Sequence, residues 1–188
     1  MPTTEPNPGS VRVAGTGAIW KAPLGTALPT DSTTAWGTGF VNMGLATDGF
    51  TRTPTLKTQK ISAWQTLFGV RSFATERGEK FTWESIESNT ATVSLAWGGA
   101  TMTPGTAGIY TLDIPDGQLA DFIIGVDWSD GVTSSRFVIP HATLVTLPVV
   151  KYVRTDAVRY PFEIEAMSPG GGVKPVIIYG VDSLVSGV

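Results

Sequence analysis

Acidic side chains and one histidine are the groups in this sequence that could do acid–base chemistry. Glu163 and Glu165 lie two residues apart on a strand-like segment, and His141 is the single histidine. Glycoside hydrolysis needs two carboxyl groups across a cleft, and a hydrolytic triad needs a histidine base beside its nucleophile. Two acids side by side on one strand face are typical of a solvated or interface surface, and no G-x-S-x-G motif accompanies His141. The sequence therefore predicts no catalytic centre.

Metal and cofactor motifs do not emerge either. A zinc site needs several Cys or His ligands, and the chain has 0 Cys and 1 His. The segment DWSDG at residues 127–131 resembles the start of a calcium loop, but its glycine comes one residue early and the closing glutamate is missing. The stretch Gly15–Gly17 lacks the third glycine of a dinucleotide-binding motif. We expect no metal and no cofactor.

Composition favours a single domain that is poor in charge. The chain has 188 residues, of which 41% are hydrophobic and 15% are charged, against about 25% charged residues in an ordinary soluble domain. A surface with few charges suits a subunit that meets copies of itself. The first ten residues, MPTTEPNPGS, have neither a basic nor an apolar region, so we expect no secretory signal. No run approaches the about 18 apolar residues that span a bilayer, so we expect no membrane partner.

Charge is distributed unevenly along the chain. Residues 51–81 contain six basic and two acidic side chains, whereas residues 84–135 contain seven acidic side chains and no basic one. This pattern fits two differently solvated faces. It also fits head-to-tail association, in which the basic segment of one copy binds the acidic segment of another.

The first half of the chain predicts short strands separated by turns. Residues 1–16, rich in Pro, Thr and Gly, predict a flexible arm. The apolar run Val41–Leu45, followed by Asp48-Gly49, predicts a strand that ends in a tight turn. Pro54 lies within a threonine-rich stretch, residues 51–58, and predicts an extended edge or loop. Between Val70 and Glu87, two strand patterns predict a hairpin about a turn at Arg77-Gly78.

One helix is predicted directly after this region. Ser88 or Asn89 can accept from the free amides of a first helical turn. Val93, Ala96 and Trp97 then recur at the spacing of one helix face, and Gly98-Gly99 predicts the end of the helix.

The second half predicts further strands. Residues 121–128 and 132–139 flank Ser129-Asp130-Gly131 and predict a hairpin, in which Phe122, Ile124, Val126 and Trp128 share one face. Other strands are predicted at Leu144–Val150, Arg159–Ala166 and Pro175–Tyr179. Many short strands with one helix predict a mainly-β fold, a β-sandwich or β-barrel with one short flanking α-helix.

Several local phrases, taken in their order, resemble a known family. They are GTGAIWKAPLGTALPTD at residues 15–31, KISAWQ at 60–65, VRSFATERGEKFTWESIESN at 70–89 and FEIEAM at 162–167. In this order the chain resembles the major tail tube protein of long-tailed (siphovirus-type) bacteriophages, especially phages of actinobacteria.

The resemblance implies a structural virion protein without catalysis. Such proteins have a β-barrel or β-sandwich with a flanking helix, an architecture shared with the type VI secretion tube protein. They form hexameric rings that stack into a tube around the tape measure protein, between tail terminator and distal tail proteins. The tube then conducts DNA into the host without binding it specifically. The protein is expected in the virion, after assembly in the host cytoplasm.

Site residues follow from the same resemblance. Residues 17–188 are expected to be one tail tube domain, in which residues 48–70 form a long loop that reaches the neighbouring ring. The expected contacts of that loop are Arg52, Lys57, Lys60, Trp64 and Phe68. Strand alternation adds the candidates for the lumen face: Asp121, Asp127, Glu163 and Glu165.

Two other functions stay open on the sequence. A tail terminator or distal tail protein would form one ring and then stop, whereas a tube protein stacks. A carbohydrate-binding β-sandwich would use exposed tryptophans as its binding platform.

The uneven charge gives a first prediction. If basic and acidic segments of different copies meet, added salt will screen them and raise the protein concentration needed for assembly. Sedimentation of assemblies at increasing NaCl concentration measures this. Assembly that is indifferent to salt would contradict electrostatic docking.

Overall fold

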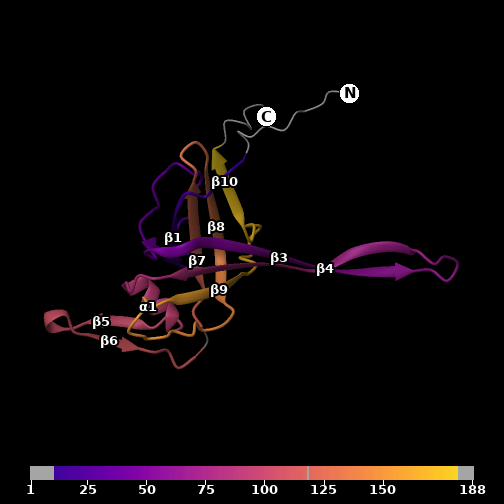
Figure 1. Ribbon diagram of the computed structural model, residues 1–188. Helices are drawn as coiled ribbons and strands as arrows, with labels where there is room; N and C mark the ends of the chain where they lie inside the picture. The colour runs from indigo at the N-terminus through magenta and orange to yellow at the C-terminus, as the bar shows by residue number, and fades with distance from the viewer. Residues whose placement is uncertain (1–10, 118, 182–188) are drawn as a thin grey trace.

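The computed structural model describes residues 11–117 and 119–181. Strands dominate this part and one short α-helix accompanies them, which confirms the predicted mainly-β class (Figure 1). Of the predicted arm at 1–16, residues 1–10 lie outside the described range and Thr16 begins the first strand. The elements are β1 (Thr16–Pro23), β2 (Val41–Asn42), β3 (Ala46–Ser62), β4 (Gly69–Ser85), α1 (Thr90–Ala96), β5 (Thr101–Pro104), a 3₁₀ turn (Thr106–Gly108), β6 (Tyr110–Asp113), β7 (Phe122–Ser129), β8 (Ser134–Leu144), β9 (Tyr160–Ala166) and β10 (Ile177–Val181).

One antiparallel sheet forms the body. Its strand order is β2-β1-β7-β8-β9-β4-β3, with β10 also paired to β8. The sheet folds over itself, so that β3 and β4 cross in front of β1, β7 and β8 (Figure 1). The strands β5 and β6 form a separate two-stranded sheet.

The change of direction takes place in β8 around Pro140. Before it, residues 134–138 of β8 pair with β10, and after it residues 142–144 pair with β9. The pairing of β8 with β7 shifts register in the same place, between the Phe122/Ala142 and Ile124/Ile139 pairs. A bulge bends a strand and leaves one residue unpaired. Proline, which has no N–H to donate to the ladder, is therefore tolerated there. This break lets one continuous sheet supply both layers.

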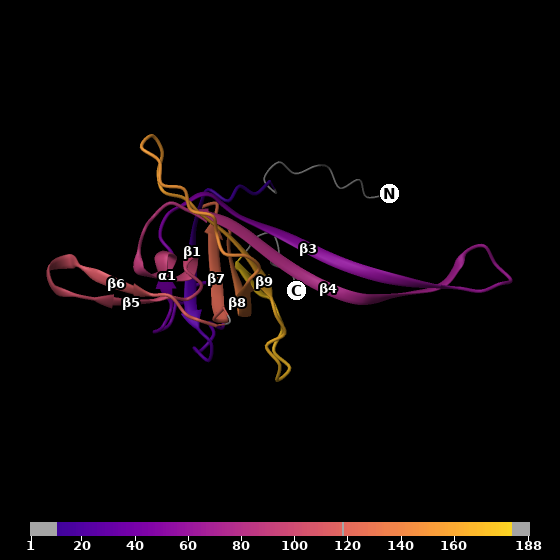
Figure 2. The same cartoon turned by 90° about the horizontal axis from the view of Figure 1, so that it is seen from below.

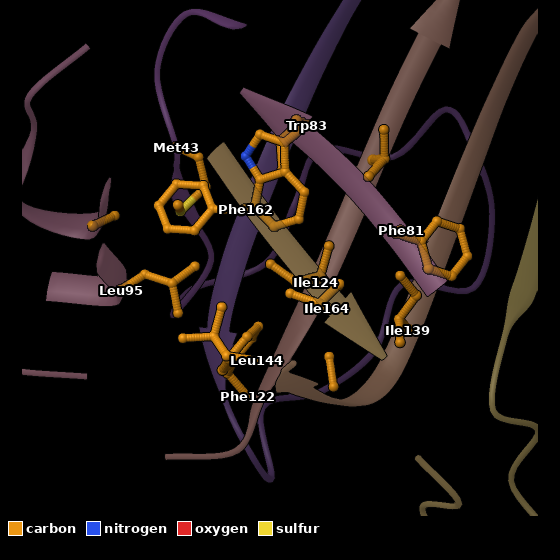
Figure 3. Packing of buried hydrophobic residues seen from close by; sticks show 14 of the residues in the cluster. Met43, Phe81, Trp83, Leu95, Phe122, Ile124, Ile139, Leu144, Phe162 and Ile164 are labelled. Carbon is orange, nitrogen blue, oxygen red and sulfur yellow. The ribbon is translucent and has the colours of Figure 1, made fainter. Parts of the chain in front are cut away.

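The main core lies between the two layers. Phe81 and Trp83 of β4 and Phe162 of β9 face Ile124 of β7, and Leu95 of α1 closes one side (Figure 3). The Trp83 and Phe162 rings lie 5.1 Å apart between centroids. Alternation along β7 and β9 produces this arrangement, since every second residue points into the core.

A loop at residues 24–40 covers the outer face of β1 and β7. The Trp36 ring lies directly over Gly125, where a Cβ would overlap it. The Arg136 guanidinium stacks 4.2 Å from the Trp36 ring and makes two hydrogen bonds to Asp127, at 2.8 and 3.1 Å. Arg136 also donates to the backbone carbonyls of Asp31 and Thr34, at 3.1 and 2.7 Å. This Arg136 clamp, formed by Trp36, Asp127 and Arg136, holds the loop on the sheet.

Two hairpins project from the body at opposite ends. The β3–β4 hairpin extends far to one side, and the β5–β6 hairpin extends to the other (Figures 1 and 2). Residues 48–70, expected as a long loop, are therefore mostly strand, with a short turn at 63–68.

Two predicted turns were wrong because their glycines lie inside long strands. Arg77-Gly78 is not a turn, because β4 runs unbroken through it. Gly78 serves close approach instead, since a Cβ there would lie 2.7 Å from Thr55 Oγ1. Asp48-Gly49 lies within β3 at a register shift between Ala46 and Phe50, where the φ of Gly49 is 75°. Glycine marks bulges and tight packing as well as turns.

Two other predicted details need correction. No strand covers 145–150, because β8 ends at Leu144. The helix does begin after Asn89, whose side chain accepts from the Thr92 amide at 2.9 Å. Its buried face, however, consists of Ala91, Thr92, Leu95 and Ala96, while Trp97 is its half-exposed C-cap. The predicted hairpin about residues 129–131 and the strand at 159–166 are confirmed as β7–β8 and β9.

Gly125→Ala tests the loop packing. The added methyl group displaces Trp36, and overpacking of this kind typically costs about 1–3 kcal/mol. Urea unfolding followed by tryptophan fluorescence measures the loss. Gly37→Ala is the matched control, because a Cβ at Gly37 meets no atom within 4 Å. Equal stability of the two variants would contradict the packing of Trp36 on β7.

Candidate self-assembly surface

Among the described residues, no further strand pairs with the outer part of the β3–β4 hairpin. β4 pairs with β9 only from Lys80 to Ser85, so the hairpin is two-stranded from Glu79 outward. Every residue from Thr51 to Arg77 is exposed except Ala63, which is half-buried. Two-stranded hairpins are marginally stable in water when nothing packs on them. We name residues 51–79 the arm.

An ion-pair cluster lies where the arm leaves the core. Arg52 donates through Nε and Nη2 to the two carboxylate oxygens of Glu79, at 2.8 Å each. Arg77 Nη2 adds a third bond to Glu79 Oε1 at 3.1 Å. The Glu79 side chain is only 8% exposed. The hydrogen bonds from Arg52 and then from Arg77 outweigh burial and lower the pKa of Glu79.

The tip of the arm is apolar and unburied. Trp64, Leu67 and Phe68 are 98%, 103% and 84% exposed. The Phe68 amide donates to Thr66 Oγ1 at 3.2 Å, and the Thr66 amide to the Ala63 carbonyl at 3.2 Å, so the turn has a defined shape. Contiguous exposed apolar surface of this kind marks a binding site for another macromolecule.

The five residues predicted to contact the neighbouring ring all lie on the β3–β4 hairpin but have different surroundings. Trp64 and Phe68 lie at the tip, and Lys60 near it has no ion-pair partner among the described residues. Lys57 pairs with Glu76 at 2.7 Å on the exposed surface. Arg52 belongs to the base of the arm, where Glu79 holds it. Sequence reasoning missed the other exposed apolar residues of the arm, which are Leu56, Ile61, Leu67, Val70 and Phe73.

Three of the four acidic candidates lie on β7 and β9, which do not pair with each other, and Asp121 directly precedes β7. On β7, Asp127 is held by Arg136 in the clamp. Just before β7, Asp121 Oδ2 lies 2.9 Å from His141 Nε2. On β9, Glu163 accepts a hydrogen bond from Lys80 at 2.9 Å and raises the pKa of Lys80. Glu165, opposite Lys80 in the register, is half-buried. These carboxylates are therefore largely paired within one chain.

Other kinds of site find no support in the described part of the chain. No group of three or more His, Asp or Glu residues there could hold a metal ion. No helix among the same residues is long and apolar enough to cross a membrane.

Comparison with protein families matches residues 4–178 to a phage tail tube protein family. The match covers most of the 188 residues, the arm and both layers of the body included. The chain belongs to the phage tail tube protein family. Its members are structural parts of the virion and not enzymes. A search of curated proteins found no significant match.

Family membership explains why a catalytic centre is not expected. A tail tube protein works by assembling with other tail components, which needs binding surfaces and no catalytic site. The absence of a catalytic centre, predicted from the sequence, agrees with the family.

Glu79→Gln tests the cluster at the base of the arm. The variant loses charged hydrogen bonds at a buried carboxylate, which should lower the free energy of unfolding by about 2 kcal/mol at neutral pH. Because the pKa of Glu79 lies below its ordinary value of 4.5, this stabilisation is present above about that pH and is lost as the pH falls through the lowered pKa. The gap between wild type and variant should therefore narrow in acid.

Urea unfolding of the two proteins at neutral and acidic pH measures this gap. Glu76→Gln is the matched control, because its pair with Lys57 is exposed and should contribute less than about 1 kcal/mol. A gap that stays constant with pH would contradict the role of the Glu79 charge.

Proposed function

We propose that this protein assembles into hexameric rings that stack into the phage tail tube, the conduit through which DNA is ejected into the host. Residues 17–188 act as one tail tube domain, and residues 48–70 reach the neighbouring ring. The tube surrounds the tape measure protein and meets tail terminator and distal tail proteins at its ends. Assembly takes place in the host cytoplasm, and the product is part of the virion.

The observation that carries this proposal is the apolar tip on an unsupported arm. Burying an apolar side chain of this size contributes about 1.5–3 kcal/mol, so the three tip residues together offer roughly 5 kcal/mol per contact before ordering costs. That gain is unavailable to the monomer, because the arm extends away from its own core (Figure 2). A second copy that receives the tip would recover it.

The five predicted contact residues take different roles in this proposal. Trp64 and Phe68 supply the apolar contact with the neighbouring ring, and Lys60 and Lys57 supply positive charge beside it. Arg52 acts from the base of the arm, because its bond to Glu79 fixes the direction in which the arm leaves the core.

Free sheet edges support closure of the ring. β3 is the last strand of the sheet, and its outer edge pairs with no other strand in the part of the chain that the structure describes. At the other end, β2 pairs with β1 only at Trp20 and Lys21, and the Met43 amide donates to the Ile19 carbonyl, so residues 16–18 have no strand partner on that side among the described residues. Unpaired strand edges bind further strands through main-chain hydrogen bonds, so neighbouring subunits can continue one sheet around the ring.

The lumen would carry acidic side chains that keep DNA moving. Asp121, Asp127, Glu163 and Glu165 remain the candidates for this face. A net negative wall repels phosphates and lets a duplex pass without being held. Pairing of Asp127 with Arg136 weakens its contribution.

Replacement of Trp64 and Phe68 by Ala tests the proposal. Both side chains are exposed in the monomer, so the variant should keep the unfolding midpoint of the wild type while tubes disappear. Electron microscopy of negatively stained protein measures tube formation. Val173→Ala, at an exposed position in the loop before β10, is the matched control. Tubes of ordinary length from the double variant would reject the assignment of the arm.

A further inference from the structure

We propose that the β5–β6 hairpin is the receptor for the arm of a second copy in the adjacent ring. The proposal rests on the stacking proposed above and names the surface of this same chain that receives the tip. It is carried by position, exposed apolar groups, free backbone edges and charge.

Position is the first argument. A stack that grows without a defined end joins each subunit through two different surfaces, one on each side. The arm and the β5–β6 hairpin leave the body in opposite directions, as both views show (Figures 1 and 2). Translation of one copy along this direction brings the arm of one toward the β5–β6 hairpin of the next.

The β5–β6 hairpin also lacks partners of its own. It forms a two-stranded sheet that pairs with no other strand of the body among the described residues. Ile109 and Tyr110, where the turn meets β6, are 68% and 56% exposed, and Ile114, directly after β6, is 60% exposed. A short hairpin with such a surface is stabilised by pairing with a further strand or by contact with apolar side chains. The arm offers both.

Charge distinguishes this receptor from other surfaces. Lys60 and Arg71 lie near the tip of the arm without ion-pair partners among the described residues. The hairpin and the residues after it carry Asp113 and Asp116, and no basic residue occurs anywhere from 81 to 135. Opposite charges at the two ends favour arm-to-hairpin docking, and like charges disfavour hairpin-to-hairpin docking.

Cross-linking between copies tests the contact directly. The natural chain has 0 cysteines, so introduced ones report without background. Gln65→Cys at the tip and Thr111→Cys on β6 are both exposed positions. Tubes assembled from an equal mixture of the two variants should give a disulfide-linked dimer under mild oxidation. A mixture of Gln65→Cys with Val132→Cys, in the exposed β7–β8 turn, is the matched control and should give little.

Charge reversal supplies a second readout. Lys60→Glu with Arg71→Glu should raise the critical concentration for tube formation about tenfold or more, and so should Asp113→Lys with Asp116→Lys. The four changes combined should restore it. If the wild type forms tubes but the Gln65→Cys and Thr111→Cys variants do not cross-link and the combined charge reversal does not restore assembly, the β5–β6 hairpin is not the receptor. The tube role would then stay intact. A wild-type protein that forms no tubes would instead overturn the proposed function.

Discussion

The β3–β4 hairpin continues well beyond the strand that supports it, and this constraint shapes the rest of the molecule. From Glu79 outward no third strand pairs with the arm in the described ranges, and its tip exposes Trp64, Leu67 and Phe68. A hairpin of this kind holds its direction only through its base. The bonds of Arg52 to Glu79 join β3 to β4 at that base, and Arg77 adds a bond to Glu79 within β4.

The body is built to keep that base rigid. Pro140 and the register shift beside it turn one sheet into two crossing layers, and the aromatic core between them fixes β4. On the outer face, the Arg136 clamp holds the loop at 24–40 with a partly buried ion pair and a stacked tryptophan. Breaking one partner of such a pair is costly, because the other charge stays in place. A packed body with one unsupported arm fits the proposal that neighbouring subunits bind the arm.

Much of this could be read from the sequence, because period-2 alternation survives in β7 and β9 and Asn89 is a clear N-cap. The arm could not. Glycine at 78 predicted a turn, yet it serves the close approach of Thr55, and only the pairing of two long strands reveals this. Likewise, the family resemblance assigned Arg52 to the contact with the neighbouring ring and gave no sign of its ion pair within the chain. Its partner Glu79 is 27 residues away, so nothing local signals the bond.

Electron microscopy of the purified wild-type protein at increasing concentration, together with its tape measure protein, tests the central claim most directly. We expect stacked rings with a central channel, growing without a fixed length, with the arm crossing from each ring to the next. Closed rings that never stack would contradict it and would indicate a tail terminator or distal tail protein. Rings that stack with the arm folded away from the ring boundary would contradict the role given to Trp64 and Phe68.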